Sequence, residues 1–298
     1  MLILKGLGRK TMKDKTKNIL ELHLTFLLLG LAAIFVKGIA FPAFFINFAR
    51  SVIAASVLGV VLIFVKKQKL LVNNWRDLVV LCLIGVFMAT HWLTAVFSLQ
   101  LSTVAITSLA MGMIPIFSTF IEPIFFKEKI SLSDILLAMI ALGGLFLMIP
   151  EFSFANNLTL GAIFGVFSAL AFSIRSVLCK KYIKKYSASL IMFYQLCVTA
   201  LITFPFIFWV EFSINNVFSW INLILLAILA TVVGQTLMIR SFKHFKVATV
   251  SIQASLITLY AILFAMFFLQ EIPHPKTIIG GMVIISVAAI ETWRHRKR

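Results

Sequence analysis

The chain has 298 residues, of which 61% are hydrophobic and only 12% are charged, and its mean hydropathy is +1.07. A soluble domain carries roughly a quarter charged residues, so this composition excludes an ordinary soluble protein and indicates one that crosses a membrane several times. The net charge of +17 would suggest nucleic acid as a partner in a soluble chain. In a membrane protein the positions of the basic residues instead indicate which connections lie on the cytoplasmic side, and we expect no nucleic-acid partner.

Apolar stretches long enough to span a bilayer follow one another along nearly the whole chain. A span needs roughly 20 mostly apolar residues. The connections between the stretches are short, which leaves no room for a soluble domain. We therefore predict an all-α integral membrane fold with ten transmembrane helices, at about 19–38, 42–65, 77–98, 103–126, 132–150, 158–179, 188–210, 219–240, 247–269 and 275–293.

The basic segment 1–18 and the first span resemble a secretory signal. The span is too long for an ordinary signal core, has no obvious cleavage site and leads straight into further spans. We expect it to be retained as the first helix. Residues 1–18 and 294–298 are then basic cytoplasmic tails.

Lysine and arginine fall on alternate connections. With the N-terminus inside, only Lys37 and Lys276 lie outside, and Arg50 and Arg175 lie within spans. The positive-inside rule then predicts that both termini are cytoplasmic and that the number of spans is even.

A pattern between Ser98 and Glu128 recurs between Ser241 and Glu271 at one constant offset without a gap. The charge distribution puts the first copy's end inside and the second copy's end outside, so the copies are inverted. Inverted repeats around a central site are typical of secondary transporters. We expect two five-helix units, residues 19–150 and 156–293. The matched pairs are Ser98/Ser241, Val104/Val247, Ala105/Ala248, Ser108/Ser251, Ile114/Ile257, Phe125/Phe268 and Glu128/Glu271.

These features, with four local motifs, resemble the EamA-type branch of the drug/metabolite transporter superfamily. The resemblance implies two five-helix units around a cavity lined by helices 1, 3, 4, 6, 8 and 9, and transport of amino acids, nucleotide-linked metabolites or other small solutes. The chain differs from the usual pattern in Lys127, where a small glycine often precedes the glutamate, and in His91–Trp92. The motifs are Pro42 to Arg50, Ser102–Ser108, a glutamate closing the fourth helix of each half, and the pairs Gly143–Gly144 and Gly280–Gly281.

Two charged residues lie where the membrane should exclude them, since a charge at mid-membrane costs at least about 2.5–3.5 kcal/mol. Arg50 lies about 12 Å inside the external end of the second span. It either faces an anion in the cavity or gate, or it caps carbonyls or pairs with a carboxylate between helices. Glu122 either carries a coupling proton or pairs with Lys127 near the interface.

Polar residues of the third and eighth spans meet at the repeat offset. His91 and Trp92 correspond to Gly234 and Gln235. A site at an inverted-repeat interface should draw on such positions, and imidazole, indole and amide supply hydrogen bonds and a flat apolar face. Trp92 has the alternative role of an interfacial anchor.

Small and hydroxylated residues of the fourth and ninth spans complete the candidates. Ser108 and Ser251 fit either a binding site or close helix packing. Gly112 with Pro115 should kink the fourth span into a gate or pocket wall. The substrate-binding candidates are His91, Trp92, Ser108, Met111, Gln235, Gln253 and Tyr260, and the coupling or gating candidates are Arg50, Glu122, Gly112 and Pro115. Glu128 and Glu271 should cap the following helix or pair with Lys129 or Lys276.

The sequence has no catalytic, phosphate-loop or metal-spaced motif, and Cys82, Cys179 and Cys197 form no ligand pattern. We expect no cofactor, no metal and no enzyme. The interpretation is a secondary transporter that moves a small polar or amphipathic metabolite across the cytoplasmic membrane by alternating access, as a monomer or homodimer in the lipid bilayer. A channel or structural membrane protein, and a membrane-embedded enzyme using His91, are the alternatives.

Overall fold

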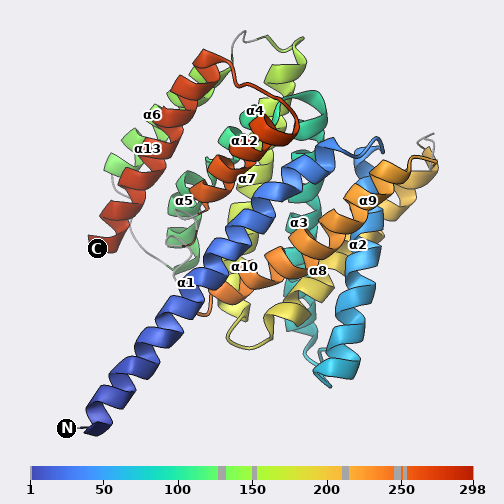
Figure 1. Cartoon of the computed structure of the whole chain (residues 1–298), viewed down its shortest axis with the longest axis vertical. Helices are drawn as coiled ribbons and strands as arrows, with labels where there is room; N and C mark the ends of the chain where they lie inside the picture. Colours follow the sequence, from blue (N-terminus) through green and yellow to red (C-terminus); the bar gives the residue numbers. More distant parts are fainter. Residues whose placement is uncertain are drawn as a thin grey trace.

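A computed structural model gives the chain as a bundle of helices (Figure 1). It describes residues 2–126, 132–149, 153–209, 215–244, 250 and 254–297. Within these residues there is no strand, as expected. The helices of the first half are α1 (Leu2–Lys37), α2 (Ala43–Val60) continued by the π-helix η1 (Val61–Val65), α3 (Trp75–Leu101), α4 (Val104–Met111), α5 (Ile114–Phe126) and α6 (Leu132–Met148).

The second half follows the same plan. Its eighth predicted span is built from three consecutive pieces, the middle one a π-helix. The helices are α7 (Asn157–Tyr182), α8 (Ala188–Thr203) continued by the 3₁₀-helix η2 (Phe204–Trp209), α9 (Val217–Leu225), the π-helix η3 (Leu226–Gln235), α10 (Thr236–Ser241), α12 (Ser255–Phe268) and α13 (Pro275–Lys297).

Among the described residues, seven stretches are long and apolar enough to cross a membrane, so the chain is a multi-pass membrane protein. Three shorter apolar helices, Ile135–Met148, Leu256–Phe268 and Pro275–Val287, lie where the fifth, ninth and tenth spans are predicted. The seven are Leu20–Lys37, Ala43–Val65, Trp75–Leu101, Val104–Phe125, Asn157–Tyr182, Ala188–Trp209 and Val217–Ser241.

Side-chain caps fix where five of the helices begin. At each start a side-chain oxygen accepts a hydrogen bond from a backbone N–H of the first turn, which would otherwise be unpaired. The caps are Asn74, Thr103, Asn156, Ser187 and Asn216.

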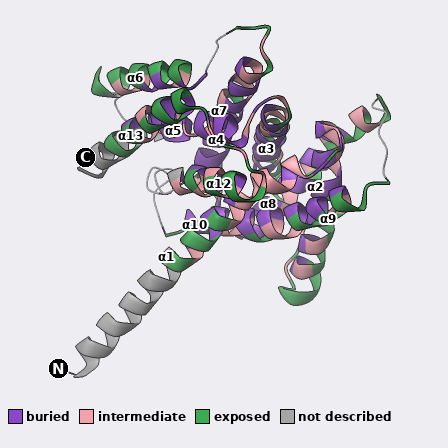
Figure 2. Cartoon of the chain, turned by 45° about the horizontal axis from the view of Figure 1, so that its top comes forward, coloured by how far each residue is buried: buried purple, intermediate pink, exposed green. Residues whose placement is uncertain are grey.

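The bundle buries apolar and polar side chains together and exposes many large apolar side chains, unlike a soluble protein. Figure 2 shows buried residues concentrated around α3, α4 and α7 and exposed residues along α6 and α13. Exposed side chains include Leu136, Ile140 and Phe267, whereas Ser98 and Ser168 are fully buried. This distribution suits a surface in contact with lipid, where helices associate through small and hydroxylated residues rather than through apolar burial.

One glycine from each predicted pair, Gly144 of the fifth span and Gly280 of the tenth, lies at the contact between these two spans. α6 and α13 lie side by side (Figure 1). A Cβ on Gly280 would lie 2.4 Å from the carbonyl oxygen of Gly144, so the two backbones approach more closely than any side chain would permit. Thr277 Oγ1 donates to the Met148 carbonyl at 2.8 Å in the same contact.

Glu271 of the second half contacts Val104 and Lys37 of the first half at the predicted external end. The Val104 N–H donates to Glu271 Oε2 at 2.8 Å, and Lys37 Nζ lies 3.7 Å from Glu271 Oε1. Lys37 Nζ also donates to the Ser102 carbonyl at 2.6 Å. Gln270, with φ of 54°, turns the chain out of α12 just before Glu271. Glu271 therefore caps α4 of the other half and pairs with Lys37, a different role from capping the next helix. Its counterpart Glu128 lies outside the described residues.

We predict that Glu271→Ala lowers stability more than Glu271→Gln. Alanine removes a helix cap, which costs about 1 kcal/mol, whereas glutamine keeps an oxygen for the Val104 N–H and loses only a partly exposed ion pair worth up to about 1 kcal/mol. Thermal unfolding of the purified protein measures both. Glu21→Gln, which breaks the outlying pair with Arg240, is the control and should have the smallest effect. Equal losses for the two Glu271 variants would contradict the cap.

Candidate functional site

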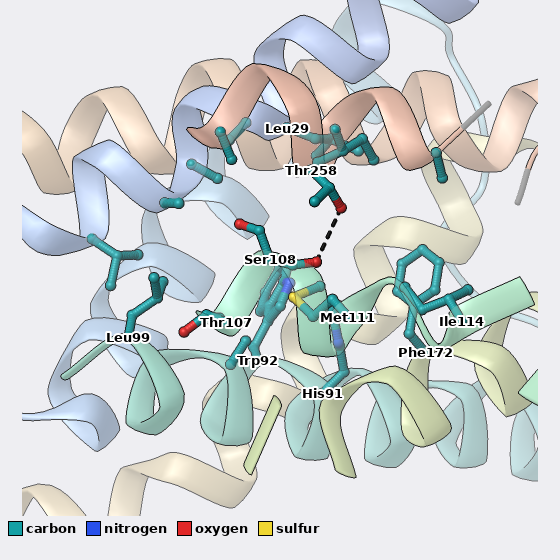
Figure 3. Close-up of a pocket in the computed structure, with 18 of the residues that line it drawn as sticks. Leu29, His91, Trp92, Leu99, Thr107, Ser108, Met111, Ile114, Phe172 and Thr258 are labelled. Atoms are coloured by element: carbon teal, nitrogen blue, oxygen red, sulfur yellow. Dashed lines mark hydrogen bonds between the residues drawn. The ribbon is translucent and has the colours of Figure 1, made fainter. Parts of the chain in front are cut away.

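An internal cavity of about 120 Å³ lies between the two halves. Figure 3 shows His91, Trp92, Thr107, Ser108 and Met111 around it. Its walls come from α1, α3, α4, α5, α7, η3 and α12, the helices that the family resemblance implied, and Arg50 adds α2. Most of its lining is apolar with a few polar groups, as in typical ligand pockets. The lining is Leu29, Ala32, Ala33, Val36, Arg50, His91, Trp92, Ala95, Val96, Leu99, Thr107, Ser108, Met111, Gly112, Ile114, Pro115, Phe172, Ala230, Gln235, Ala254, Ile257, Thr258 and Ala261.

Eight of the eleven predicted site residues line this cavity: Arg50, His91, Trp92, Ser108, Met111, Gly112, Pro115 and Gln235. Tyr260 is not in the lining and packs where α12 meets α1, since a Cβ on Gly30 would lie 2.8 Å from Tyr260 Cβ. Glu122 is half-buried in α5 and is not in the lining. Gln253, and Lys127 as the suggested partner of Glu122, lie outside the described residues.

The Arg50 side chain is held rigidly at the cavity wall. It is only 4% exposed, and its Nε and Nη2 donate to Thr231 Oγ1 at 3.3 and 2.9 Å. The guanidinium carbon lies 3.7 Å from the centre of the Trp92 ring, a cation–π contact that is strengthened where water is excluded. Neither a carbonyl nor a carboxylate of the described residues pairs with it. Thr231 and Trp92 thus contact one edge and one face of the guanidinium, and no hydrogen bond joins Nη1 to another group of the described residues.

The π-helix η3 positions the eighth span's contribution. A π-helix brings residues five apart in sequence onto one face, and such turns occur frequently at functional sites. Thr231 Oγ1 donates to the Leu226 carbonyl at 2.9 Å, across that interval, while Ala230 and Gln235, also five apart, both line the cavity. Gln235 is 5% exposed, and its Oε1 has no hydrogen-bond partner in the described structure. It is an acceptor in need of a donor.

His91 is oriented by α7. Its Nδ1 lies 3.1 Å from the Ser168 carbonyl oxygen and 2.7 Å from Ser168 Oγ, and that hydroxyl donates to the His91 carbonyl at 3.0 Å. A carbonyl oxygen can only accept, so we assign the proton to Nδ1, and Nε2 remains an acceptor.

The fourth span is broken at the cavity wall. Gly112 N–H is shared between the Ser108 and Leu109 carbonyls at 3.1 and 2.9 Å, and Thr258 Oγ1 donates to the Ser108 carbonyl at 3.0 Å (Figure 3). Pro115 has no N–H, so the Met111 carbonyl lacks its helical donor. Gly112 and Pro115 both line the cavity beside this break.

These features describe a multi-pass membrane protein whose helices surround a cavity, and the family to which it belongs makes it a membrane transporter. The chain belongs to the EamA-like transporter family, whose model matches residues 17–149 and again 159–291.

Named relatives agree with this membership. An uncharacterized transporter of Archaeoglobus fulgidus is 29% identical over 198 residues, which are 66% of this chain and 70% of the relative. The pseudopaline exporter CntI of Pseudomonas aeruginosa is 24% identical over 250 residues, 84% of this chain and 87% of the exporter. A solved crystal structure, 17% identical, superposes with a TM-score of 0.69 over 95% of this chain and 98% of that one, which shows a shared fold.

We predict that Thr231→Val destabilises the protein through Arg50. Valine keeps the shape but leaves two buried guanidinium nitrogens without an acceptor, at a cost of about 1–3 kcal/mol. Thermal unfolding should show this loss in the wild-type background and little of it in Arg50→Met, because the partner is already gone.

Thr199→Val is the matched control for this pair, since the buried Thr199 hydroxyl donates only to the Gln195 carbonyl of its own helix. It should cost less than Thr231→Val. If the Thr231 and Arg50 losses simply add, the two side chains do not act as a unit.

Proposed function

We propose that this protein is a secondary carrier of a small polar or amphipathic solute, and that the cavity is its binding site within an alternating-access cycle. The observation that carries the proposal is the convergence of residues from both halves, Arg50 and His91 with Gln235, on one internal cavity. Secondary transporters commonly bind their solutes at the midplane interface between repeats.

We also propose ten spans in two inverted five-helix units, residues 19–150 and 156–293, with the tails 1–18 and 294–298 and both termini in the cytoplasm. The helix contacts support this arrangement. We number the spans in chain order, so that exchange of the two halves turns the first span into the sixth, the second into the seventh, and so on. The contact of α3 with α7 (spans 3 and 6) then corresponds to the contact of η3 with α1 (spans 8 and 1). In the same way, the contact of α4 with α7 (spans 4 and 6) corresponds to that of α12 with α1 (spans 9 and 1). α2 with α8 (2–7) and α6 with α13 (5–10) are their own counterparts. The twofold match of the family model supports it further.

The lining favours a solute with an acidic group, a hydrogen-bond donor and an apolar part. Arg50 Nη1 suits a carboxylate, Gln235 Oε1 and His91 Nε2 suit N–H or O–H donors, and Val36 and Leu99 supply apolar wall. The relative named as an exporter of pseudopaline supports a role in solute transport, and its limited identity gives no reason to assign that molecule here. Proton coupling by Glu122 stays a hypothesis.

Counterflow into proteoliposomes, with a panel of small acids and amines, tests the carrier. We expect saturable exchange in the wild type, and about 2- to 10-fold weaker apparent affinity in Gln235→Ala and His91→Ala, because each loses a hydrogen bond worth about 0.5–1.5 kcal/mol. Membrane abundance should stay nearly unchanged.

Thr94→Ala is the control on the same helix as His91, since the Thr94 hydroxyl donates only to carbonyls of α3. It should transport normally. Non-saturating flux without exchange would instead identify a channel, and normal transport by both cavity variants would place the binding site elsewhere.

Topology is tested by single-cysteine labelling. The native Cys82, Cys179 and Cys197 are first replaced so that only the introduced cysteine can react; Cys197 in particular is exposed. Cysteines at Asn73 and Lys184 should react only from the cytoplasmic side, and cysteines at Asn156 and Asn216 only from outside, because basic connections stay inside. Labelling of Asn73 or Lys184 from outside would overturn the inverted arrangement.

A further inference from the structure

Arg175 in α7 is a buried cation that has no ionic partner among the residues that the structure describes. It is 0% exposed and is among the largest fully buried side chains. Its Nε donates to Gln195 Oε1 at 2.6 Å, but Nη1 and Nη2 are buried with no hydrogen-bond partner in the described part of the chain. An unpaired buried guanidinium is costly, because its charge is neither hydrated nor neutralised.

The polar groups around Arg175 are already engaged. Gln195 Nε2 donates to the Ile191 carbonyl at 3.1 Å. The Ser173 hydroxyl is directed to the Ile114 carbonyl at 3.0 Å, and the Ser176 hydroxyl to the Phe172 carbonyl at 2.7 Å. The ion pairs of the described residues hold Glu21, Asp77 and Glu271 elsewhere. A group that satisfies Nη1 and Nη2 must therefore come from outside these contacts, and two parallel donors match a carboxylate.

The Phe172 side chain adjoins both Arg175 and the solute cavity. Its ring lines the cavity (Figure 3) and lies 4.8 Å from the His91 ring. The Arg175 guanidinium carbon lies 5.3 Å from the centre of the same ring. The Phe172 ring thus contacts both the cavity and Arg175, and an aromatic side chain can change rotamer without any change in the backbone.

We propose that Arg175 is a second carboxylate-binding site, closed by Phe172 in this structure, which receives the acidic group of the solute after it leaves Arg50. The inference rests on the proposed carrier function. Arg175 lies about 10 Å from the Tyr182 end of α7, which is the proposed cytoplasmic end, whereas Arg50 lies about 12 Å from the proposed external end of α2. Arg175 thus lies nearer the proposed cytoplasmic side than Arg50 does.

Arginine-selective labelling with phenylglyoxal, read residue by residue by mass spectrometry on the reconstituted full chain, tests this site. In the wild type we expect the exposed Arg76 and Arg240 to be modified and Arg175 to be spared. Phe172→Ala removes one phenyl ring and leaves a space matched to the ring of the reagent, so an Arg175 adduct should appear. Phe172→Leu, which keeps more of the apolar volume, should give a smaller yield and replaces the alanine variant if that fails to fold.

Benzoate, its neutral analogue benzamide and chloride serve as competing probes in the opened variant. Benzoate should slow Arg175 modification about tenfold, the ratio that one charge-assisted hydrogen bond supports, with no effect on Arg76. Benzamide and chloride should protect little. Equal protection by benzamide, protection by chloride alone, or no adduct in either Phe172 variant while Arg76 reacts normally, would overturn the site.

Counterflow separates this inference from the carrier proposal. Arg175→Gln should weaken apparent affinity for an acidic solute presented from the cytoplasmic side about tenfold, and should leave the external side nearly unchanged. Ser176→Ala, on the neighbouring position, should affect neither. If the wild type shows counterflow but neither Phe172 variant gives an Arg175 adduct, only the second site is refuted. If an adduct forms and benzoate protects it, but no counterflow is seen, the carrier and the transfer of solute between the two arginines are refuted, and an anion site at Arg175 remains.

Discussion

The structure depends on one constraint: a polar group inside a membrane-spanning bundle must find its partner within the protein, because lipid offers none. Many buried hydroxyls meet it locally by donating to a carbonyl one turn back, as Thr25, Thr199 and Thr203 do. The groups without partners in the described structure are few. Some belong to neutral side chains such as Asn47 and Ser51, on the helix that carries Arg50. Gln235 and Arg175 are different, since one faces the cavity and the other is charged.

The same constraint accounts for how the halves are joined. At one end, the orphan N–H of Val104 finds the Glu271 carboxylate, which also meets Lys37, so a helix cap and an ion pair share one side chain. At the side of the bundle, Gly144 and Gly280 bring two backbones into contact without polar side chains. The residues of these two contacts do not reach into the space between α1, α3, α4 and η3. The cavity lies in that space.

The sequence alone identified residues whose free-energy cost inside a membrane depends on their own chemistry and not on their neighbours. Arg50 is expensive wherever it stands in a span, Pro115 always lacks its N–H, and the repeat offset ties Trp92 to Gln235; all four now lie at one cavity. The approximate positions of the spans followed from apolar length alone. Tyr260 was chosen for its hydroxyl, but which face of α12 meets α1 depends on packing that the sequence pattern does not encode.

Other parts of the site had no sequence signal. Thr231 and Ser168 look like any small polar residue in a span, and their roles arise only when α2 and α3 come within hydrogen-bond distance. Phe172 is one phenylalanine among thirty, and only its place between His91 and Arg175 sets it apart. The π-helix η3 is set by tertiary contacts, because its extra residue per turn has no local preference to favour it.

That π-helix gives the cavity a physical means of responding to a solute. A ligand shifts a conformational equilibrium only by the difference in its affinity for the two states. Thr231, which holds Arg50, and Gln235, which offers an unpaired acceptor, lie on the same short π-helix. A return of η3 to α-helical register would rotate both positions relative to α2 at once. The Arg50 anchor and the Gln235 acceptor would then change together, so a solute that engages both side chains would favour one register over the other.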